Sequence, residues 1–504
     1  MTGSVASVLK SKNLDVEVVD ANLYRWSFYK TVQELKKKSI KLLGVHLVYL
    51  WDKTEDVFEM FKELRREGVN AHINLYGHFP TFAFEEILSG YSFVDSITIG
   101  EPEYTFLELA EAVTNSNGNS SLHSIDGLAF NFTSNEKSYK FPSENPTNPP
   151  LPPLLKGDLG GLSSSFIPLS EYDNINKNVF KPEIIKNKPR KPIPNLDDIP
   201  FPYRPCFEIL KARGIATYIL ASRGCYGKCT FCYLNQFYSE EPLWRGRRPE
   251  NIIDEICHIY EKYDERYFYF ADANFFGPGR QGKVRACKLA HMIMDRGLKM
   301  NFGIECRVND VEEKTIGLLV KAGLREVFLG VESGSQDSLD RFRKFTTIEE
   351  NKKAINILRQ FGIEPNYGFI LFGPDSTLKE VRENFEFLNE MKMLRSPSIT
   401  AHLMHHRQTI FKGTPDYENR RNSAKSVCRF NYEYVCNFRD ERVGELAENI
   451  KSFCYETLYN LSGNEDLKKD HTSCSYDEDD SFSKKLNQKL IEHFEGALYS
   501  LETK

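Results

Sequence analysis

Three cysteines follow one another closely in the segment 222–232. Cys225, Cys229 and Cys232 have C-x3-C-x2-C spacing, and Gly224 and Gly227 lie among them. Cysteine thiolates are the usual ligands of iron–sulfur clusters. Three thiolates on one loop can bind three irons of a cubic cluster and leave the fourth iron open, while glycines let the backbone wrap tightly. The spacing therefore predicts a [4Fe–4S] cluster.

Other uses of three cysteines have to be weighed. A structural zinc site normally has four protein ligands, and no fourth candidate lies near the loop. Three unligated core cysteines and a conventional four-cysteine cluster stay open as alternatives. None of the other cysteines has a paired spacing, which disfavours the second of these.

The loop resembles the signature of the radical S-adenosylmethionine (SAM) superfamily. This resemblance implies that Cys225, Cys229 and Cys232 hold the cluster and that SAM chelates the open iron through its amino and carboxylate groups. Reduction of the cluster then cleaves SAM to a 5′-deoxyadenosyl radical. Phe231 matches the aromatic position that packs on the adenine in that family.

Four later segments resemble further SAM-binding motifs of that family. Residues 270–275 match the segment that meets the SAM amino group, and 330–334 match the motif that contacts the ribose or methionine. Residues 369–373 match a glycine-containing strand near the adenine, and an arginine ends the third strand, where it can pair with a carboxylate. The implied SAM contacts are Phe231, Asp272, Asn274, Arg307, Glu332 and Ser333.

The N-terminal segment, 1–130, resembles the cobalamin-binding domain that precedes the barrel in one large radical SAM subclass. The resemblance rests on residues 18–22, 77–81 and 100–105, together with the end of the linker at 193–202. The implied cobalamin contacts are Gly77, His78, Thr81, Gly100 and Glu101. No Asp-x-His-x-x-Gly motif is present, so no histidine is assigned as a lower axial ligand.

The elements around these motifs indicate two α/β domains. In the first domain we expect strands at 15–19, 41–48, 71–75 and 96–99, with helices at 28–38, 54–67, 82–88 and 103–113. Alternation of this kind predicts a doubly wound, flavodoxin-like parallel sheet. The chain opens on a helix-like segment, 5–10, with no strand before it. Residues 131–205 are rich in proline and predict a linker, interrupted by a hairpin of 128–132 with 138–141.

Strand–helix alternation returns over 206–420. We expect strands at 216–221, 267–271, 300–306, 326–330, 364–371 and 398–403, separated by helices such as 249–263 and 377–392. This pattern predicts a partial (β/α)6 TIM-type barrel, whose active site would lie at the carboxyl ends of the strands. Residues 421–504 predict a small helical C-terminal region.

Composition limits the function classes. The 504 residues carry 66 Lys and Arg against 71 Asp and Glu, a net charge of −5, which argues against a general nucleic-acid binder. The sequence has no run of about 18 apolar residues, so no membrane span is predicted. The start of the sequence lacks the features of a signal peptide. Eleven cysteines without such a signal indicate reduced thiols or metal ligands. We therefore expect a cytoplasmic protein.

These resemblances imply a radical SAM enzyme. The resemblance to the cobalamin-binding subclass favours, as its reaction, methyl transfer to an unactivated carbon or phosphorus of a metabolite, natural product or peptide. The expected partners are that substrate and an electron donor such as flavodoxin or ferredoxin. The alternatives are a non-methylating rearrangement or cyclisation and a non-enzymatic Fe–S or cobalamin carrier. A methylthiotransferase is disfavoured, because it needs three more cysteines in its N-terminal domain and residues 1–205 contain none.

Overall fold

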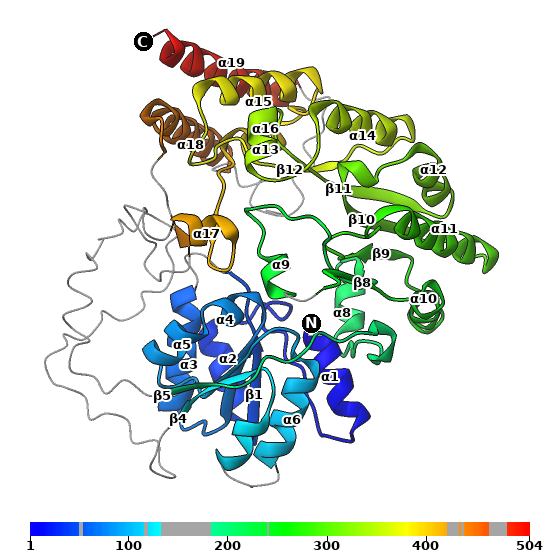
Figure 1. The fold of residues 1–504 in the computed structure, drawn as a ribbon, viewed down its shortest axis with the longest axis vertical. Helices are drawn as coiled ribbons and strands as arrows, with labels where there is room; N and C mark the ends of the chain where they lie inside the picture. The colour runs from blue at the N-terminus through cyan, green and yellow to red at the C-terminus, as the bar shows by residue number, and fades with distance from the viewer. Residues whose placement is uncertain are drawn as a thin grey trace, which may run out of the picture.

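The computed structural model describes residues 1–49, 54–114, 119–132, 183–238, 241–420, 433–434, 438–462 and 481–503. In Figure 1 the N-terminal α/β unit, in blue and cyan, lies below a larger α/β unit in green and yellow. The C-terminal helices, in orange and red, lie on the far side of the larger unit. The predicted α/β fold with a helical C-terminal region is confirmed.

The N-terminal sheet has the strand order β1-β2-β3-β4-β5. Strands β1 (Leu42–His46), β2 (His72–Tyr76) and β3 (Ser96–Thr98) are parallel, and β4 (Leu128–Phe132) and β5 (Glu183–Lys186) are antiparallel. Helices α2 (Phe28–Lys36), α3 (Thr54–Arg66) and α5 (Phe84–Gly90) pack in one core on one face. Helices α1 (Thr2–Ser11) and α6 (Pro102–Thr114) pack in another core. Helices on both faces make the unit doubly wound, as expected.

The first predicted strand of this unit is wrong. Residues 15–19 pair with no strand, and the chain before them forms α1. In a flavodoxin-like sheet, of order 2-1-3-4-5, the second strand lies at the edge and pairs only with the first. Residues 15–19 take the place of that second strand, and a first strand would have to come before them in the chain. Because the preceding residues are helical, the backbone of 15–19 has no strand edge beside it.

The segment predicted as a linker contributes to this sheet. Strand β5 lies within 131–205 and pairs with β4, so residues 183–186 belong to the N-terminal unit in the structure. The predicted strand at 128–132 is confirmed as β4, whereas its predicted partner at 138–141 lies outside the described residues. A short helical turn, Asn119–Ser124, leads into β4, and another, Leu196–Asp198, leads towards the second unit.

The second unit contains a parallel sheet of order β12-β11-β10-β9-β6. Its strands are β6 (Thr217–Ile219), β9 (Tyr267–Phe270), β10 (Asn301–Arg307), β11 (Leu324–Glu332) and β12 (Asn366–Phe369). The helices packed in the same core include α10 (Pro249–Tyr263), α11 (Gly279–Asp295), α12 (Glu313–Lys321), α14 (Ile348–Gln360) and α15 (Leu378–Glu390). Helices α14 and α15 each begin with a Thr-x-x-Glu capping box, which fixes where they start.

The sixth predicted barrel strand, 398–403, is wrong. These residues lie in helix α16 (Pro397–His405), with Pro397 in the first turn, where proline is tolerated. Thr400, Ala401, Leu403 and Met404 are buried, a helical rather than an alternating spacing. After α16, Arg407 makes a single parallel bridge to Phe372. The sixth position of the barrel is therefore marked by one bridge rather than by a strand.

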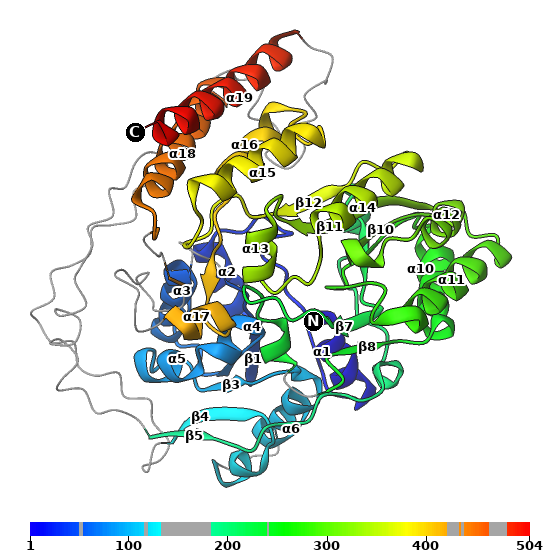
Figure 2. The same ribbon diagram turned by 45° about the horizontal axis from the view of Figure 1, so that its top comes forward.

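The remaining elements are distributed over both units and the C-terminal region. They are α4 (His78–Phe82), α8 (Phe207–Ala212), β7 (Ser222–Gly224), α9 (Leu234–Phe237), β8 (Trp244–Gly246), α13 (Gln336–Arg341), β13 (Ile410–Phe411), α17 (Pro415–Arg420), β14 (Glu433–Tyr434), α18 (Glu441–Ser462) and α19 (Ser481–Glu502). Helices α18 and α19 lie side by side and pack on α15 and α16 (Figures 1 and 2). Phe385 of α15 stacks on Phe494 of α19 at 4.7 Å. Within the described ranges, no helix combines the length and apolarity that a membrane span requires.

Candidate active site

The three cysteines lie on one loop at the carboxyl end of the barrel sheet. We call residues 225–232 the cluster loop; it begins directly after β7, which pairs antiparallel with β8. Gly224 ends β7 with a φ of +82°, and a Cβ there would lie 1.9 Å from the carbonyl oxygen of Leu243. A side chain at 224 is therefore excluded both by backbone conformation and by space.

The thiols of the cluster loop lie close enough to influence one another. Burial raises the pKa of Cys232 to about 12, and Cys229 and Cys225 raise it further. Burial also raises the pKa of Cys225, opposed by the N–H of Gly227, which donates to its Sγ at 3.4 Å. Over the described ranges, no three His, Cys, Asp or Glu side chains converge on a single ion. Cysteines that bind a cluster attach to different irons and need not converge.

Arg307 places a positive charge against the cluster loop. Its Nη1 donates to Cys229 Sγ at 3.4 Å, and its Nη2 donates to the carbonyl oxygen of Lys344. A Cβ at Gly227 would lie 2.3 Å from Nη1, so the guanidinium can lie this close to the cluster loop only because residue 227 is glycine. The guanidinium also lies over the Tyr226 ring, 5.5 Å from its centroid. Arg307 therefore contacts a cysteine sulfur; its predicted bond to the SAM carboxylate stays a prediction.

Asp272 and Asn274 follow β9 and are both fully buried. Asp272 Oδ1 accepts hydrogen bonds from the backbone and the hydroxyl of Ser222, the latter at 2.7 Å, whereas Oδ2 has no partner. Burial raises the pKa of Asp272 to about 7. Asn274 donates to Asp310 at 2.6 Å and accepts from the N–H of Gly277 at 2.6 Å. Asp272 thus has an open acceptor, and both ends of the Asn274 amide are used within the protein.

Glu332 ends β11 in a strained conformation. Its φ is +67°, in the left-handed region that non-glycine residues rarely adopt, and the register with β12 shifts at this point. Its Oε1 forms an ion pair with Lys344 Nζ at 2.8 Å, and the lysine is buried. Such strain clusters at functional sites, where surrounding contacts hold it. This geometry was not predictable from the motif.

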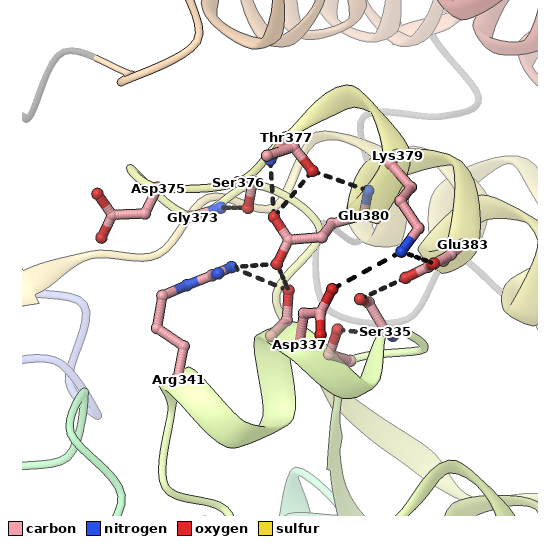
Figure 3. A network of polar contacts seen from close by, with 12 residues as sticks. Ser335, Asp337, Arg341, Gly373, Asp375, Ser376, Thr377, Lys379, Glu380 and Glu383 are labelled. Carbon is pink, nitrogen blue, oxygen red and sulfur yellow. Dashed lines mark hydrogen bonds and ion pairs between the residues drawn. The ribbon is translucent and has the colours of Figure 1, made fainter.

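The turn after Glu332 is held by helix α15. The hydroxyl of Ser333 donates to Asn384 Oδ1 at 2.7 Å, and the N–H of Gly334 donates to that amide oxygen at 2.6 Å. Ser335 Oγ donates to Glu383 at 2.5 Å, as Figure 3 shows. The Ser333 hydroxyl is therefore engaged by α15, and the predicted SAM contact of Ser333 stays a prediction. The ring of Phe231 packs edge-on against the ring of Phe342, which directly follows α13, and the two ring centroids are 5.5 Å apart.

The predicted cobalamin contacts gather at the carboxyl ends of β2 and β3. Thr81 Oγ1 accepts the N–H of Gly100 at 3.1 Å, which ties the two loops together. The His78 ring lies 4.6 Å from the Tyr233 ring and 4.4 Å from the Phe237 ring. Burial lowers the pKa of His78 to about 4, and neither of its nitrogens has a hydrogen-bond partner. Burial likewise lowers the pKa of His46, at the end of β1, to about 4, and its Nε2 is unpartnered.

A buried charge network, absent from the sequence-based site, joins the two units. Glu103, fully buried, pairs with Arg223 at 2.5 Å, and Glu101 pairs with Arg245 at 2.6 Å and with Arg223 at 3.2 Å. Glu101 also accepts the N–H of Ile193 at 2.7 Å. Its carboxylate is therefore bound within the protein, and its predicted contact with cobalamin stays a prediction. The feature of the sequence that could have indicated this network is Arg223, a basic residue two positions before the first cysteine of the cluster loop.

Comparison with known proteins agrees with this geometry. Residues 219–388 match the model of the radical SAM superfamily. This range contains the cluster loop, Asp272, Arg307 and Glu332. Residues 219–388 therefore match the radical SAM superfamily, a class whose members use a [4Fe–4S] cluster and SAM.

The related proteins include some named as methyltransferases and some named as cyclases. The chain is 24% identical to an uncharacterised methyltransferase of Pyrococcus horikoshii, over 77% of this chain and 72% of that protein. It is 27% identical to the anaerobic magnesium-protoporphyrin IX monomethyl ester cyclase of Rubrivivax gelatinosus, over 67% of this chain but 52% of that protein. The chain thus spans about half the length of that cyclase.

Two solved structures share the fold over nearly the whole chain. The cobalamin-dependent radical SAM enzyme OxsB superposes with a TM-score of 0.72 at 19% identity, covering 99% of this chain and 69% of OxsB. The radical SAM methyltransferase TsrM of Kitasatospora setae superposes with a TM-score of 0.62 at 15% identity, covering 100% and 95%. The arrangement of an N-terminal doubly wound unit before a radical SAM barrel is therefore shared with both.

Proposed function

We propose that this chain is a cobalamin-dependent methyltransferase that acts on an unactivated carbon or phosphorus atom of a small molecule or peptide. The observation that supports it most is the closeness of the two predicted cofactor regions. His78, after β2, contacts Tyr233 and Phe237, which follow the cluster loop. A ligand at the carboxyl ends of β2 and β3 would therefore face the cluster loop directly.

The N-terminal loops have features that suit cobalamin. The imidazoles of His46 and His78 are neutral and have unpartnered nitrogens, and the rim of a corrin carries amides that can bond to them. An added Cβ at Gly100, whose φ is +80°, would meet nothing within 4 Å, so the loop after β3 borders open space. OxsB and TsrM, whose structures hold cobalamin, have the same two-unit fold.

The barrel residues suit the cluster and SAM. Three thiols and the Arg307 guanidinium suit a negatively charged cluster, and the open Asp272 Oδ2 suits an ammonium such as that of SAM. When bound, these groups would supply a radical that takes hydrogen from the substrate, and cobalamin would supply the methyl group. The chain's part is to hold the groups and the substrate in one cavity and to exclude water.

A non-methylating cyclisation is the second candidate. It is favoured by the similarity to cyclases of Rubrivivax gelatinosus and Cereibacter sphaeroides, each 27% identical over the matched residues. The two candidates differ in their products. Methyl transfer should yield one S-adenosylhomocysteine and one 5′-deoxyadenosine per methylated product, whereas cyclisation should yield 5′-deoxyadenosine without a methylated product.

Cobalamin binding and SAM demethylation test the proposal without a known substrate. The reconstituted full chain, reduced with titanium(III) citrate, should form S-adenosylhomocysteine from SAM only when cobalamin is added. The variant His78→Ala should bind hydroxocobalamin more weakly, by about tenfold, because it loses a buried contact. His291→Ala, an exposed histidine of α11, is the matched control and should bind normally. Absence of cobalamin binding by the folded wild-type chain would contradict the proposal.

A further inference from the structure

The inner face of the barrel sheet carries exposed aromatic side chains in the described part of the chain. Side chains alternate along a strand, so neighbours of the buried Ile219, Phe270, Ile304 and Leu329 point to the opposite face, the inside of the barrel. These inner residues include Tyr218, Tyr269, Glu305 and Phe328. Tyr218 is 58% exposed and Phe328 is 39% exposed. Large aromatic rings with this exposure on a central sheet indicate a surface that awaits a ligand.

The rings form a continuous aromatic surface. Tyr218 and Tyr269 are paired in register on β6 and β9, with ring centroids 5.8 Å apart. A Cβ at Gly303 of β10 would lie 2.5 Å from the Tyr269 ring, so this ring lies over the neighbouring strand. Phe328, on β11, is in register with Glu305 and extends the surface across the sheet.

Two carboxyl groups lie on this aromatic surface without a basic partner. Glu305 on β10 and Glu326 on β11 form no ion pair with any lysine or arginine in the described residues. The groups beside them are tyrosines: Tyr269 next to Glu305, and Tyr267 next to Glu326. Burial raises the pKa of Glu305 to about 7. The cations at the rim are already engaged, since Arg307 contacts Cys229 and Lys344 pairs with Glu332.

The carboxyl of Glu305 also faces the cluster loop. Tyr233 directly follows Cys232, and its raised pKa reflects burial first and then the nearby Cys232 and Glu305. Glu305 is two residues before Arg307, whose guanidinium contacts Cys229. A molecule bound on the aromatic surface would therefore lie beside the cluster loop, where a SAM-derived radical would form.

We propose that this aromatic surface binds the substrate and that the substrate carries an amine or guanidinium cation on an apolar or planar group. Cations are attracted to the faces of aromatic rings, and a hydrogen bond between a carboxylate and a charged donor is stronger than one between neutral groups. An anionic substrate would meet two carboxyls and no free base in the described part of this surface. The proposal rests on the proposed function, since it takes the barrel as the site of radical chemistry.

A matched series of probes tests the charge preference. The probes are 2-phenylethylamine, 2-phenylethanol and 3-phenylpropionate, titrated into the reconstituted full chain and followed by saturation-transfer NMR. The amine should bind at least about tenfold more tightly than the alcohol, and the carboxylate should bind more weakly than both. Glu305→Gln should lower the affinity for the amine about tenfold and leave the alcohol unchanged. Glu349→Gln, which removes a carboxylate that is 85% exposed on α14, should change neither.

A second variant distinguishes a loss of substrate binding from a loss of folding. Tyr218→Leu alters a ring that is 58% exposed, so folding should be unaffected while affinity for the amine falls. Binding of 3-phenylpropionate as tight as that of the amine, or unchanged amine binding in both variants, would overturn the proposal. SAM cleavage and cobalamin binding are measured on the same samples. Loss of these activities in the wild type, with selective amine binding retained, would overturn the proposed function and not the charge preference.

Discussion

At the scale of residues, the cysteine spacing was the most informative feature of the sequence. Cys225, Cys229 and Cys232 could be proposed as cluster ligands because such a role depends on spacing along one loop, which the sequence displays directly. The roles of Asn274 and Ser333 were less accessible, because their amide and hydroxyl bond to Asp310 and Asn384 from distant segments. Local motifs do not reveal such long-range partners.

The conformation of Gly224 gives a residue-scale prediction. Gly224→Ala should lower the iron content and the melting temperature, because its Cβ would clash with Leu243 at a φ of +82°. Gly214→Ala is the matched control: its φ is also positive, +65°, but nothing lies within 4 Å of the added Cβ. Iron analysis and thermal unfolding compare them. Equal effects in the two variants would show that the clash at 224 is unimportant.

At the scale of elements, the periodic segments were predicted well and two strands were not. The strand at 15–19 fails because strand formation depends on a neighbouring strand, which a local pattern cannot show. The segment 398–403 fails because its apolar run fits both a strand and a buried helix, and the helix is settled by packing against α18 and α19. Strand β5 was missed because its short sequence, Glu-Ile-Ile-Lys, lies in a proline-rich context.

The capping box of α15 gives an element-scale prediction. Glu380 closes this box and also bonds to Ser338 at 3.1 Å and to Arg341 at 2.7 Å, so it joins α15 to α13 (Figure 3). Glu380→Ala should lower the free energy of unfolding by about 2–3 kcal/mol, as expected for loss of buried bonds to a charged group. Glu350→Ala, in the exposed box of α14, should cost about 1 kcal/mol. Urea denaturation measures both, and equal costs would contradict the bridging role.

At the scale of the whole molecule, a buried charge network connects the N-terminal unit to the strand that leads into the cluster loop. Glu101 comes from the loop after β3, Glu103 comes from the first turn of α6, and Arg223 and Arg245 come from β7 and β8. No sequence pattern predicted these pairs, since their partners lie more than 100 residues apart. The network fixes the two predicted cofactor regions relative to each other.

Removal of one partner tests this connection. Glu103→Gln should lower the stability of the whole chain by about 3 kcal/mol or more, because Arg223 would keep a buried charge with one partner fewer. Glu63→Gln removes a half-exposed carboxylate that lies 3.5 Å from Arg66 and should cost about 0–1 kcal/mol. The midpoints of urea unfolding compare the variants. A change at Glu103 no larger than at Glu63 would show that the network contributes little.

The central claim is that the cluster loop holds a [4Fe–4S] cluster that cleaves SAM, and one assay tests it most directly. The measurement is 5′-deoxyadenosine formed from SAM by the reduced, reconstituted chain, together with its iron and sulfide content. The wild type should hold about four iron and four sulfide per chain and form 5′-deoxyadenosine. The triple variant with alanine at Cys225, Cys229 and Cys232 should lose both, and Cys287→Ala, on α11 outside the cluster loop, should keep both. A normal cluster spectrum or continued 5′-deoxyadenosine formation in the triple variant would contradict the account.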